Sequence, residues 1–342
     1  MRRISRRKLL QGIGTATVGA SSLTGCLGQG SEGPLDSITV AYVPIYPNMQ
    51  HFIMQEEGYY DDLPVDVSIE RFSNGPNVVK AFASGDVDVA VAGITPAMVL
   101  LDRGTDVNVL AANGRNAFKA LATNEVAEMY ERSGAEAFGR FENEKGRKVR
   151  FGTPPDGSVP DVVLRYWLDR DLGLGELESV VSKSKIEPAR SVQTIRSGEI
   201  DATMIMEPFA SMIAGEEGFG ELAWSGEILP GHPMTGLFVN GKVLGSSELS
   251  RSLVEKHVQA TRFVEEKPQT AASHAASVIG SGVTTDLAVT ALESRASDFI
   301  SDPHAVTDQT ATMSEYVASV GNIDEPVSVD DLFAFEPYDS VQ

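Results

Sequence analysis

The sequence predicts an α/β protein built from two similar lobes around a cleft. A phrase at residues 83–98 recurs, with similar residues, at residues 196–211. Each copy has the pattern of a helix end, a turn, a buried strand and a helix that starts at a proline. A repeated αβα unit favours two similar lobes. The cleft between such lobes, at the carboxyl ends of their strands, is where ligands bind.

Strands and helices alternate through the first lobe. Strands are predicted where apolar residues alternate or run together, at residues 38–43, 65–69, 87–92 and 107–110. Helices are predicted between them, each followed by a glycine that favours a helix end, at residues 49–57, 76–84 and 96–103. Thr95 is placed to cap the third helix, with Pro96 at its first position.

The second lobe follows the same course. Its predicted strands lie at residues 149–151, 180–181 and 200–205, and its helices at 159–172, 188–196 and 208–214. Ser158 is placed to cap the first of these helices, with Asp161 as the acid of a capping box. Strands that alternate with helices predict a parallel, doubly wound sheet in each lobe.

The pattern changes after the strand predicted at residues 237–239. Three long segments are predicted to be helical with no strand between them, at residues 247–267, 270–279 and 285–299. We expect this tail to return to lobe 1, so that lobe 1 comprises residues 37–123 and 236–342 and lobe 2 residues 124–235. The two crossings, near residues 121–124 and 234–238, would form a hinge.

The N-terminus has the pattern of an export signal followed by a lipid anchor. Arg6 and Arg7 lie in a twin-arginine pattern, and a weakly apolar stretch follows that is too short and polar to span a membrane. Residues 23–25 then resemble a lipobox before Cys26, the only cysteine, which has no partner for an internal disulfide. We therefore predict a Tat signal peptide at residues 1–25, lipid on Cys26, and a linker over residues 26–36. The protein would be anchored to the outer face of the cell membrane.

The chain is strongly acidic. It has 48 Asp and Glu against 28 Lys and Arg, a net charge of −20, and loss of the five basic residues in the signal leaves 23 bases and a charge of −25. Such a charge argues against nucleic acid as a partner, because nucleic acid binding needs basic patches. The acids are spread along the chain, which favours a halophilic protein whose self-repulsion is screened by salt. An ordinary acidic protein is the alternative.

Candidate ligand-binding residues follow the carboxyl ends of the predicted strands, where helix N-termini favour polar oxygens and anions. In lobe 1 these are Tyr46, Asn48, Ser73, Asn74, Gly75, Ile94 and Thr95, and in lobe 2 they are Gly157, Ser158, Val159 and Glu207.

Most of these residues have a structural alternative. Glu207 takes the place in the second copy of the repeat that Thr95 takes in the first, and its carboxylate would either meet an amine, ring N–H or water, or only cap its own helix. Thr95 and Ser158 could likewise cap helices, contact ligand, or do both. Tyr46 could close over a ligand or lie on the surface. Asn74 is first a turn residue.

Other candidates are weaker. Arg115 is a possible anion partner but is more simply a solvated arginine, and His232 is more simply structural than catalytic. The histidines lack metal-ligand spacing. Phosphate-binding and nucleophile-elbow motifs do not occur in suitable places. We therefore expect no metal, no cofactor and no catalytic residue.

Several short motifs together resemble one family. They lie at residues 73–76, 83–88 and 93–97 in lobe 1 and at residues 155–158, 197–201 and 206–208 in lobe 2, with a turn at 230–233. From residue 38 to the C-terminus the chain resembles the substrate-binding lipoproteins of ABC importers in the nitrate, sulfonate, taurine and thiamine-precursor group.

The resemblance implies a type II periplasmic-binding-protein fold, with two Rossmann-like lobes that close on one small solute. It also implies a non-enzymatic monomer that docks on an ABC permease with its ATPase. An enzyme on the same fold, of the pyrimidine-precursor synthesis type, and a ligand-sensing lipoprotein are the alternatives. Whether the solute is an anion or an amine or pyrimidine stays open.

The lipid anchor gives a first prediction. The Cys26→Ala chain should lose its membrane attachment, because a single thiol carries the lipid, and should appear in the soluble fraction after cell lysis. Unchanged recovery of the variant with the membranes would contradict the anchor.

Overall fold

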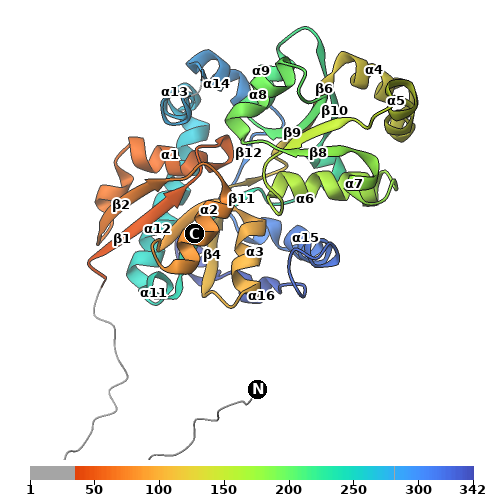
Figure 1. Cartoon of the computed structure of the whole chain (residues 1–342). Helices are drawn as coiled ribbons and strands as arrows, with labels where there is room; N and C mark the ends of the chain where they lie inside the picture. The colour runs from red at the N-terminus through yellow and green to blue at the C-terminus, as the bar shows by residue number, and fades with distance from the viewer. Residues whose placement is uncertain (1–34, 281) are drawn as a thin grey trace, which may run out of the picture. The chain divides into compact units, whose positions relative to one another are not determined.

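The computed structural model describes residues 35–280 and 282–342. The predicted signal peptide, Cys26 and most of the predicted linker lie outside these residues. Within the described part, two five-stranded sheets are flanked by helices, and a two-stranded ribbon adds to them (Figure 1).

The first sheet has the order β2 (Asp66–Arg71), β1 (Ser37–Tyr42), β3 (Val89–Gly93), β11 (Thr235–Asn240) and β4 (Val107–Ala112). β1 runs parallel to both β2 and β3. β11 runs antiparallel to its neighbours β3 and β4. The late strand β11 thus lies inside a sheet made otherwise of early strands.

The second sheet has the order β10 (Phe219–Trp224), β6 (Phe118–Thr123), β9 (Ala202–Met206), β7 (Arg150–Thr153) and β8 (Ser182–Lys185). β7 is parallel to β8 and β9, whereas β6 is antiparallel to β9 and β10. The small ribbon pairs β5 (Gly114–Arg115) with β12 (Asp298–Phe299).

The prediction of purely parallel sheets is therefore wrong. The chain passes from the first sheet into the second at β6 and returns to the first at β11. Each of these strands lacks the preceding crossover helix that parallel pairing requires. The sequence prediction also missed β6 and β10 and placed a strand at residues 180–181, where α7 ends and β8 has yet to begin. β6 belongs to the second sheet, which favours a first crossing before Phe118; the lobe boundaries stay a prediction.

Some helices start and end where local signals favour it, but two predicted caps are wrong. Ser158 makes no capping bond with its side chain, and the helix predicted to follow Thr95 already begins at Ile94. Asn74 caps α2 (Gly75–Ser84) by accepting a hydrogen bond from Asn77 N at 3.1 Å, and Gly85 ends it with a left-handed φ of 80°. Proline lies in the first turn of α6 (Val159–Tyr166) and of α8 (Pro188–Arg196), where its missing N–H costs no hydrogen bond.

The remaining α-helices that flank these sheets are α1 (Met49–Glu56), α3 (Ile94–Asp102), α4 (Asn124–Ser133), α5 (Ala137–Lys145), α7 (Leu177–Val180), α9 (Phe209–Ala214), α10 (Ser225–Ile228) and α11 (Gly241–Leu244). The C-terminal tail adds α12 (Ser247–Glu266), α13 (Pro268–Ile279), α14 (Thr285–Leu292), α15 (Thr307–Ser319), α16 (Val329–Leu332) and α17 (Glu336–Asp339).

The tail contacts both halves of the fold. α12 and α13 pack on α1, whereas α14 contacts α9, and α15 contacts α3 and α6. The helix predicted over residues 285–299 ends at Leu292, because the chain then turns to form β12.

One aspartate in each copy of the repeat fixes the central strand of its sheet. Asp88 accepts a hydrogen bond from Thr39 N at 2.9 Å, and Asp201 accepts one from Arg150 N at 2.8 Å. Burial would raise the pKa of Asp201, but hydrogen bonds from Arg150 and Arg147 outweigh it and hold that pKa well below its usual range. The repeat therefore marks the start of the central strand in both sheets.

Buried neutral histidines should make the fold sensitive to acid. Burial lowers the pKa of His257 to about 3, and its Nε2 lies 2.9 Å from Asn113 Oδ1. Below pH 6.5 the unfolded chain binds a proton here that the folded chain does not, so stability falls as the pH drops from 6.5 toward 3.

Between pH 7 and pH 5, the free energy of unfolding of His257→Gln should fall by about 2 kcal/mol less than that of the wild type. Urea unfolding at the two pH values in molar salt measures it. An acid loss equal to that of the wild type would contradict this origin.

Candidate functional site

A small cavity of about 50 Å³ lies where residues of the two sheets face each other. A water molecule needs at least about 10–15 Å³ by this measure, so the cavity has room for a few groups of water size. Its walls are Val43, Ile45, Pro47, Asn74, Gly75, Gly93, Pro96, Phe118, Pro154, Pro155, Ser158, Val159, Pro160, Pro188, Met206, Met234 and Thr235.

Four helices begin at this cavity. The wall residues include the first residues of α2 and α8, the third residue of α3 and the first two of α6. Helices that follow parallel strands start at the carboxyl edge of the sheet, which is why these N-termini converge. α2 and α3 come from the first half of the fold, and α6 and α8 from the second. A solute in the cavity would therefore contact both.

The lobes come close at one glycine. A Cβ on Gly93, the last residue of β3, would lie 3.0 Å from Val159 Cγ2 at the start of α6. This distance is tighter than ordinary side-chain packing allows, so the absence of a side chain at Gly93 permits the observed approach of β3 to α6.

Four of the eleven predicted ligand-binding residues line the cavity, namely Asn74, Gly75, Ser158 and Val159. Tyr46, Asn48, Ser73, Ile94, Thr95, Gly157 and Glu207 do not line it. Ser73 lies in an adjoining surface pocket of about 320 Å³ that also contains Arg71 and Glu187. Ligand contact remains a prediction for all eleven.

Tyr46 and Asn48 are buried parts of the scaffold. The Tyr46 hydroxyl donates to Ala288 O in α14, and burial raises its pKa. Asn48 Nδ2 donates to Val43 O at 2.8 Å and Val91 O at 3.0 Å. Asn48 thereby ties the loop after β1 to β3, and both of these strands lead to the cavity.

Glu207 is buried and paired. One carboxylate oxygen accepts from Ser211 N at 2.9 Å, and the other lies 3.3 Å from Lys119 Nζ. Lys119 lies on β6, the strand next to β9, which ends directly before Glu207. The geometry therefore matches the helix-capping alternative and adds a cation, Lys119, that no local pattern could predict.

Two hydrogen bonds join the lobes beside the cavity. Thr95 Oγ1 donates to Gly157 O at 2.7 Å, and Asn74 Nδ2 donates to Glu187 Oε1 at 2.9 Å. Each bond links the start of a helix in the first half to the loop before a helix in the second. Together they favour the closed arrangement seen here.

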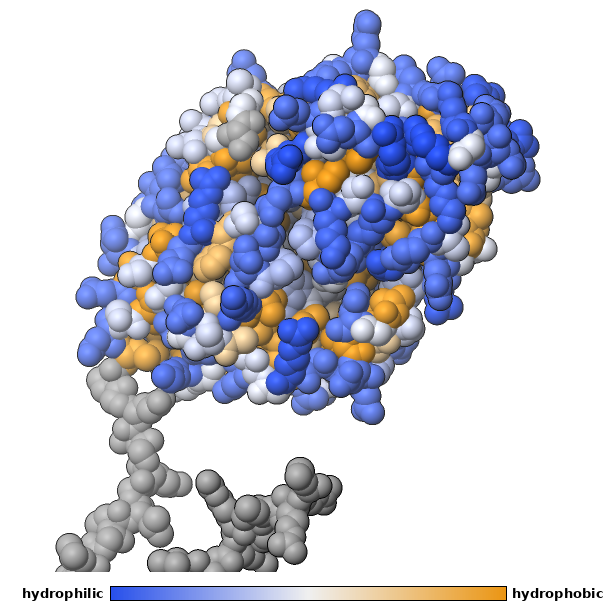
Figure 2. All heavy atoms as spheres, in the orientation of Figure 1, coloured by the Kyte–Doolittle hydropathy of each residue, from blue (hydrophilic) through white to orange (hydrophobic). Residues whose placement is uncertain are grey.

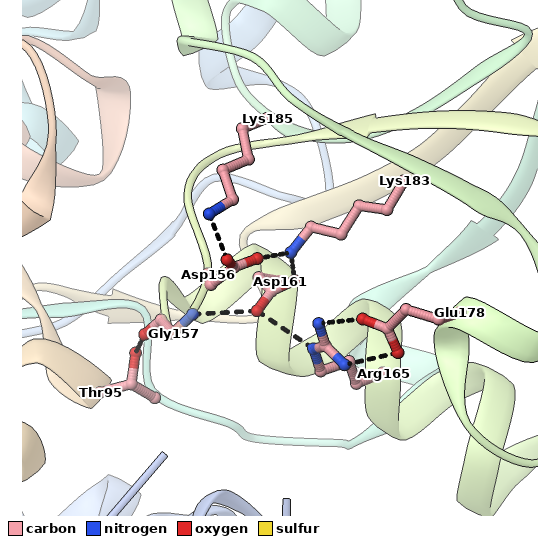
Figure 3. Close-up of polar contacts among 8 residues, drawn as sticks. All are labelled: Thr95, Asp156, Gly157, Asp161, Arg165, Glu178, Lys183 and Lys185. Carbon is pink, nitrogen blue, oxygen red and sulfur yellow. Dashed lines mark hydrogen bonds and ion pairs between the residues drawn. The ribbon is translucent and has the colours of Figure 1, made fainter. Parts of the chain in front are cut away.

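The loop that receives Thr95 is held by a network of charges (Figure 3). Asp161 is fully buried and accepts from Gly157 N at 2.9 Å, from Arg165 Nε at 3.3 Å and from Lys183. Asp156 pairs with Lys183 and Lys185. Burial would raise the pKa of Asp156, but the two lysines lower it to about 2. The network fixes the loop without placing a charge in the cavity.

Ser158 is the one wall residue whose side chain has a buried polar atom without a hydrogen-bond partner. Its Oγ is buried and has no hydrogen-bond partner. The other polar wall side chains are occupied, since Thr235 Oγ1 donates to Pro47 O at 2.7 Å and the Asn74 amide bonds Glu187 and Asn77. A polar atom of a bound solute would satisfy Ser158.

The cavity wall also contains residues that are not among the eleven predicted ligand-binding residues. Pro47, Gly93, Pro154, Pro155 and Met206 follow predicted strands, but apolar residues there carry no chemical signal. Phe118, Met234 and Thr235 lie on or beside the crossing strands, where only tertiary structure brings them to the cavity. His232 stacks on Phe118 with ring centroids 5.6 Å apart, and burial lowers its pKa to about 4.

Arg115 is paired with an aspartate, and the described residues form no acidic or histidine cluster suited to a metal. Arg115 Nε donates to Asp298 Oδ2 at 2.7 Å across the β5–β12 ribbon. Over residues 35–280 and 282–342, His, Cys, Asp and Glu do not gather in groups of three or more that could hold a metal. In the same ranges, none of the helices combines the length and apolar character needed to cross a bilayer.

Comparison with known proteins identifies the family. Residues 31–280 match the NMT1-like family. The chain belongs to this family. The family resemblance expected from the motifs is thereby confirmed.

Two curated proteins illustrate the relationship of this NMT1-like chain. It is 24% identical over 221 residues to a Brucella abortus protein named as a candidate binding protein, across 64% of this chain and 63% of that protein. It is 23% identical over 307 residues to the bicarbonate-binding protein CmpA of Synechococcus, across 75% of this chain and 62% of CmpA. The matches span less than two thirds of either relative.

Solved structures share the fold. The nitrate-binding protein NrtA from Synechocystis superposes with a TM-score of 0.75 at 14% identity, covering 90% of this chain and 88% of NrtA. The aliphatic sulphonate-binding protein SsuA from Escherichia coli gives a TM-score of 0.68 at 14% identity, covering 87% and 92%. The predicted two-lobed fold of periplasmic binding proteins is confirmed.

The bonds between the lobes of the NMT1-like chain give a prediction. Thr95→Val keeps the side-chain shape but removes the bond to Gly157, which is worth about 0.5–1.5 kcal/mol. The ratio of closed to open molecules should fall about two- to twelvefold. Distances between spin labels at Lys80→Cys and Gln193→Cys, in a Cys26→Ala background, measure this ratio.

Thr312→Val is the matched control, because the Thr312 hydroxyl bonds Asp308 O within a single helix. An unchanged distance distribution in Thr95→Val, or an equal change in the control, would contradict a role of Thr95 in closure.

Proposed function

We propose that this NMT1-like protein is an extracytoplasmic solute-binding protein that delivers one small polar solute to the permease of an ABC importer. The observation that carries the proposal is the cavity, whose walls come from both sheets and whose edge is bridged by two bonds between the lobes. A solute held this way would stabilise the closed form through contacts that the open form lacks.

The relatives support the same role. NrtA, SsuA and CmpA are named for the binding of nitrate, sulphonate and bicarbonate. These solutes have few atoms, in keeping with a cavity of about 50 Å³. We propose a solute of similar size for this chain, from a range that includes sulfonates, taurine and thiamine-pyrimidine precursors.

The finer parts of the proposal rest on the sequence. We propose that a Tat signal exports the chain, that lipid on Cys26 anchors it to the outer face of the membrane, and that it acts as a monomer with no cofactor. The acidic composition supports a protein adapted to high salt, and Figure 2 shows blue, hydrophilic residues spread over the visible face. Unfolding on dialysis into low-salt buffer is the result expected of such a protein.

A thermal-shift screen of the full chain in molar potassium chloride tests the function. A solute at 100 times its dissociation constant should stabilise the fold by about 2.7 kcal/mol. Nitrate, bicarbonate, taurine, alkanesulfonates and thiamine pyrimidines should be screened, and each stabilising solute then incubated with the protein and analysed by mass spectrometry.

The expected result is a solute that binds and is recovered unchanged. Conversion of the solute would overturn the proposal in favour of an enzyme on the same fold. Genes for a receptor or kinase beside this one, in place of a permease and an ATPase, would favour a ligand-sensing lipoprotein.

A further inference from the structure

We propose that the solute is an uncharged molecule with a largely apolar body and one hydrogen-bonding group that meets Ser158. This inference rests on the proposed function and narrows the class of solute. It differs from the small anions for which the relatives are named, which are nitrate, bicarbonate and sulphonate. It follows from the wall of the cavity.

The wall offers no ionic partner. Within the described part of the chain, the residues that line the cavity include no Lys, Arg, His, Asp or Glu. Twelve of the 17 are apolar and two are glycines. A buried ion without a paired charge or several hydrogen bonds is strongly disfavoured, because its desolvation is not compensated. An apolar or weakly polar solute carries no such cost.

The helix N-termini do not replace the missing cation. Four helices begin here, and free backbone N–H groups at such ends are a common site for anions. Each of the four has proline within its first three residues, at Pro76, Pro96, Pro160 and Pro188. Proline has no N–H, so every helix loses a donor at the end that faces the cavity.

Several of the remaining donors are already used. Asn77 N donates to Asn74 Oδ1 at 3.1 Å, Ile94 N donates to Met234 O at 3.2 Å, and Gly157 N donates to Asp161 at 2.9 Å. The backbone donors that remain suit a solute with partial charges better than an ion.

The carboxylates nearest to the cavity are paired with groups of the protein itself. Glu207 is held by Lys119 and Ser211, and Glu187 by Asn74. Asp156 and Asp161 share Lys183. Arg71, Lys80 and Arg103 line adjoining pockets and not the cavity itself, so a solute confined to the cavity gains no cation from them.

Ser158 requires one hydrogen-bonding group on the solute. Its buried Oγ has no protein partner, and a hydroxyl can both donate and accept. A carbonyl, sulfonyl, amide or hydroxyl group on the solute would satisfy it. The proline, valine and methionine side chains and the ring of Phe118 would cover the rest of the molecule.

Matched probes that differ in charge but not in shape test the proposal. The full chain in molar potassium chloride is titrated with dimethyl sulfone against methanesulfonate, and with acetamide against acetate and acetamidinium. Benzamide and benzoate extend the series in size, and nitrate and bicarbonate are added. Binding is measured by calorimetry and by the shift in melting temperature.

The expected result is at least tenfold tighter binding of the neutral member of a set than of its charged partners. Ser158→Ala should weaken that binding about tenfold, as expected for loss of one buried hydrogen bond. Ser179→Ala, an exposed serine, is the matched control and should bind as the wild type does. Melting of both variants without probe shows that each remains folded.

The other outcomes distinguish failure of this inference from failure of the proposed function. Tighter binding of nitrate, bicarbonate, methanesulfonate or acetate, weakened by Ser158→Ala, would overturn the neutral solute but leave the binding function intact. Binding that neither variant changes would overturn the assignment of Ser158. Failure of every probe, neutral and charged, to bind would overturn this inference and count against the proposed function as well.

Discussion

Two aspartates hold the central strand of each sheet, and the site depends on them. Asp88 bonds the neighbouring strand β1 through Thr39 N, and Asp201 bonds the neighbouring strand β7 through Arg150 N. Each lies just before the strand whose last residue, Gly93 or Met206, faces the cavity. Their carboxylates fix the depth at which these strands end. The position of the helices that follow is set by the same junction.

The cavity is surrounded by helix N-termini whose hydrogen-bonding groups are in part absent and in part already used. Prolines take away backbone donors, Asn74 and Asp161 occupy others, and Lys119 neutralises Glu207. Each of these features stabilises the scaffold locally, because it satisfies a group that would otherwise need water. Together they leave an apolar cavity with a single free hydroxyl. The fold thus supplies the cleft, and the side chains of its wall supply the chemistry.

Closure and binding use neighbouring parts of the same elements. Thr95 and Asn74 bridge the lobes, and the residues next to them, Pro96 and Gly75, line the cavity. The loop that accepts the Thr95 bond is fixed by Asp161 and Lys183 (Figure 3). A solute that fills the cavity would therefore act on the same helix starts that the bridging bonds hold together, which couples occupancy to closure.

The sequence by itself determined the two αβ units, most of their strands and helices, and the helix starts that surround the cavity. These depend on periodicity, capping residues and prolines, which act over a few neighbouring residues. Tertiary structure decided the antiparallel entry of β6 and β11, the pairing of Glu207 with Lys119, and the placing of Phe118, Met234 and Thr235 in the wall. These contacts join residues far apart along the chain, and no local pattern encodes which distant strand will lie beside which.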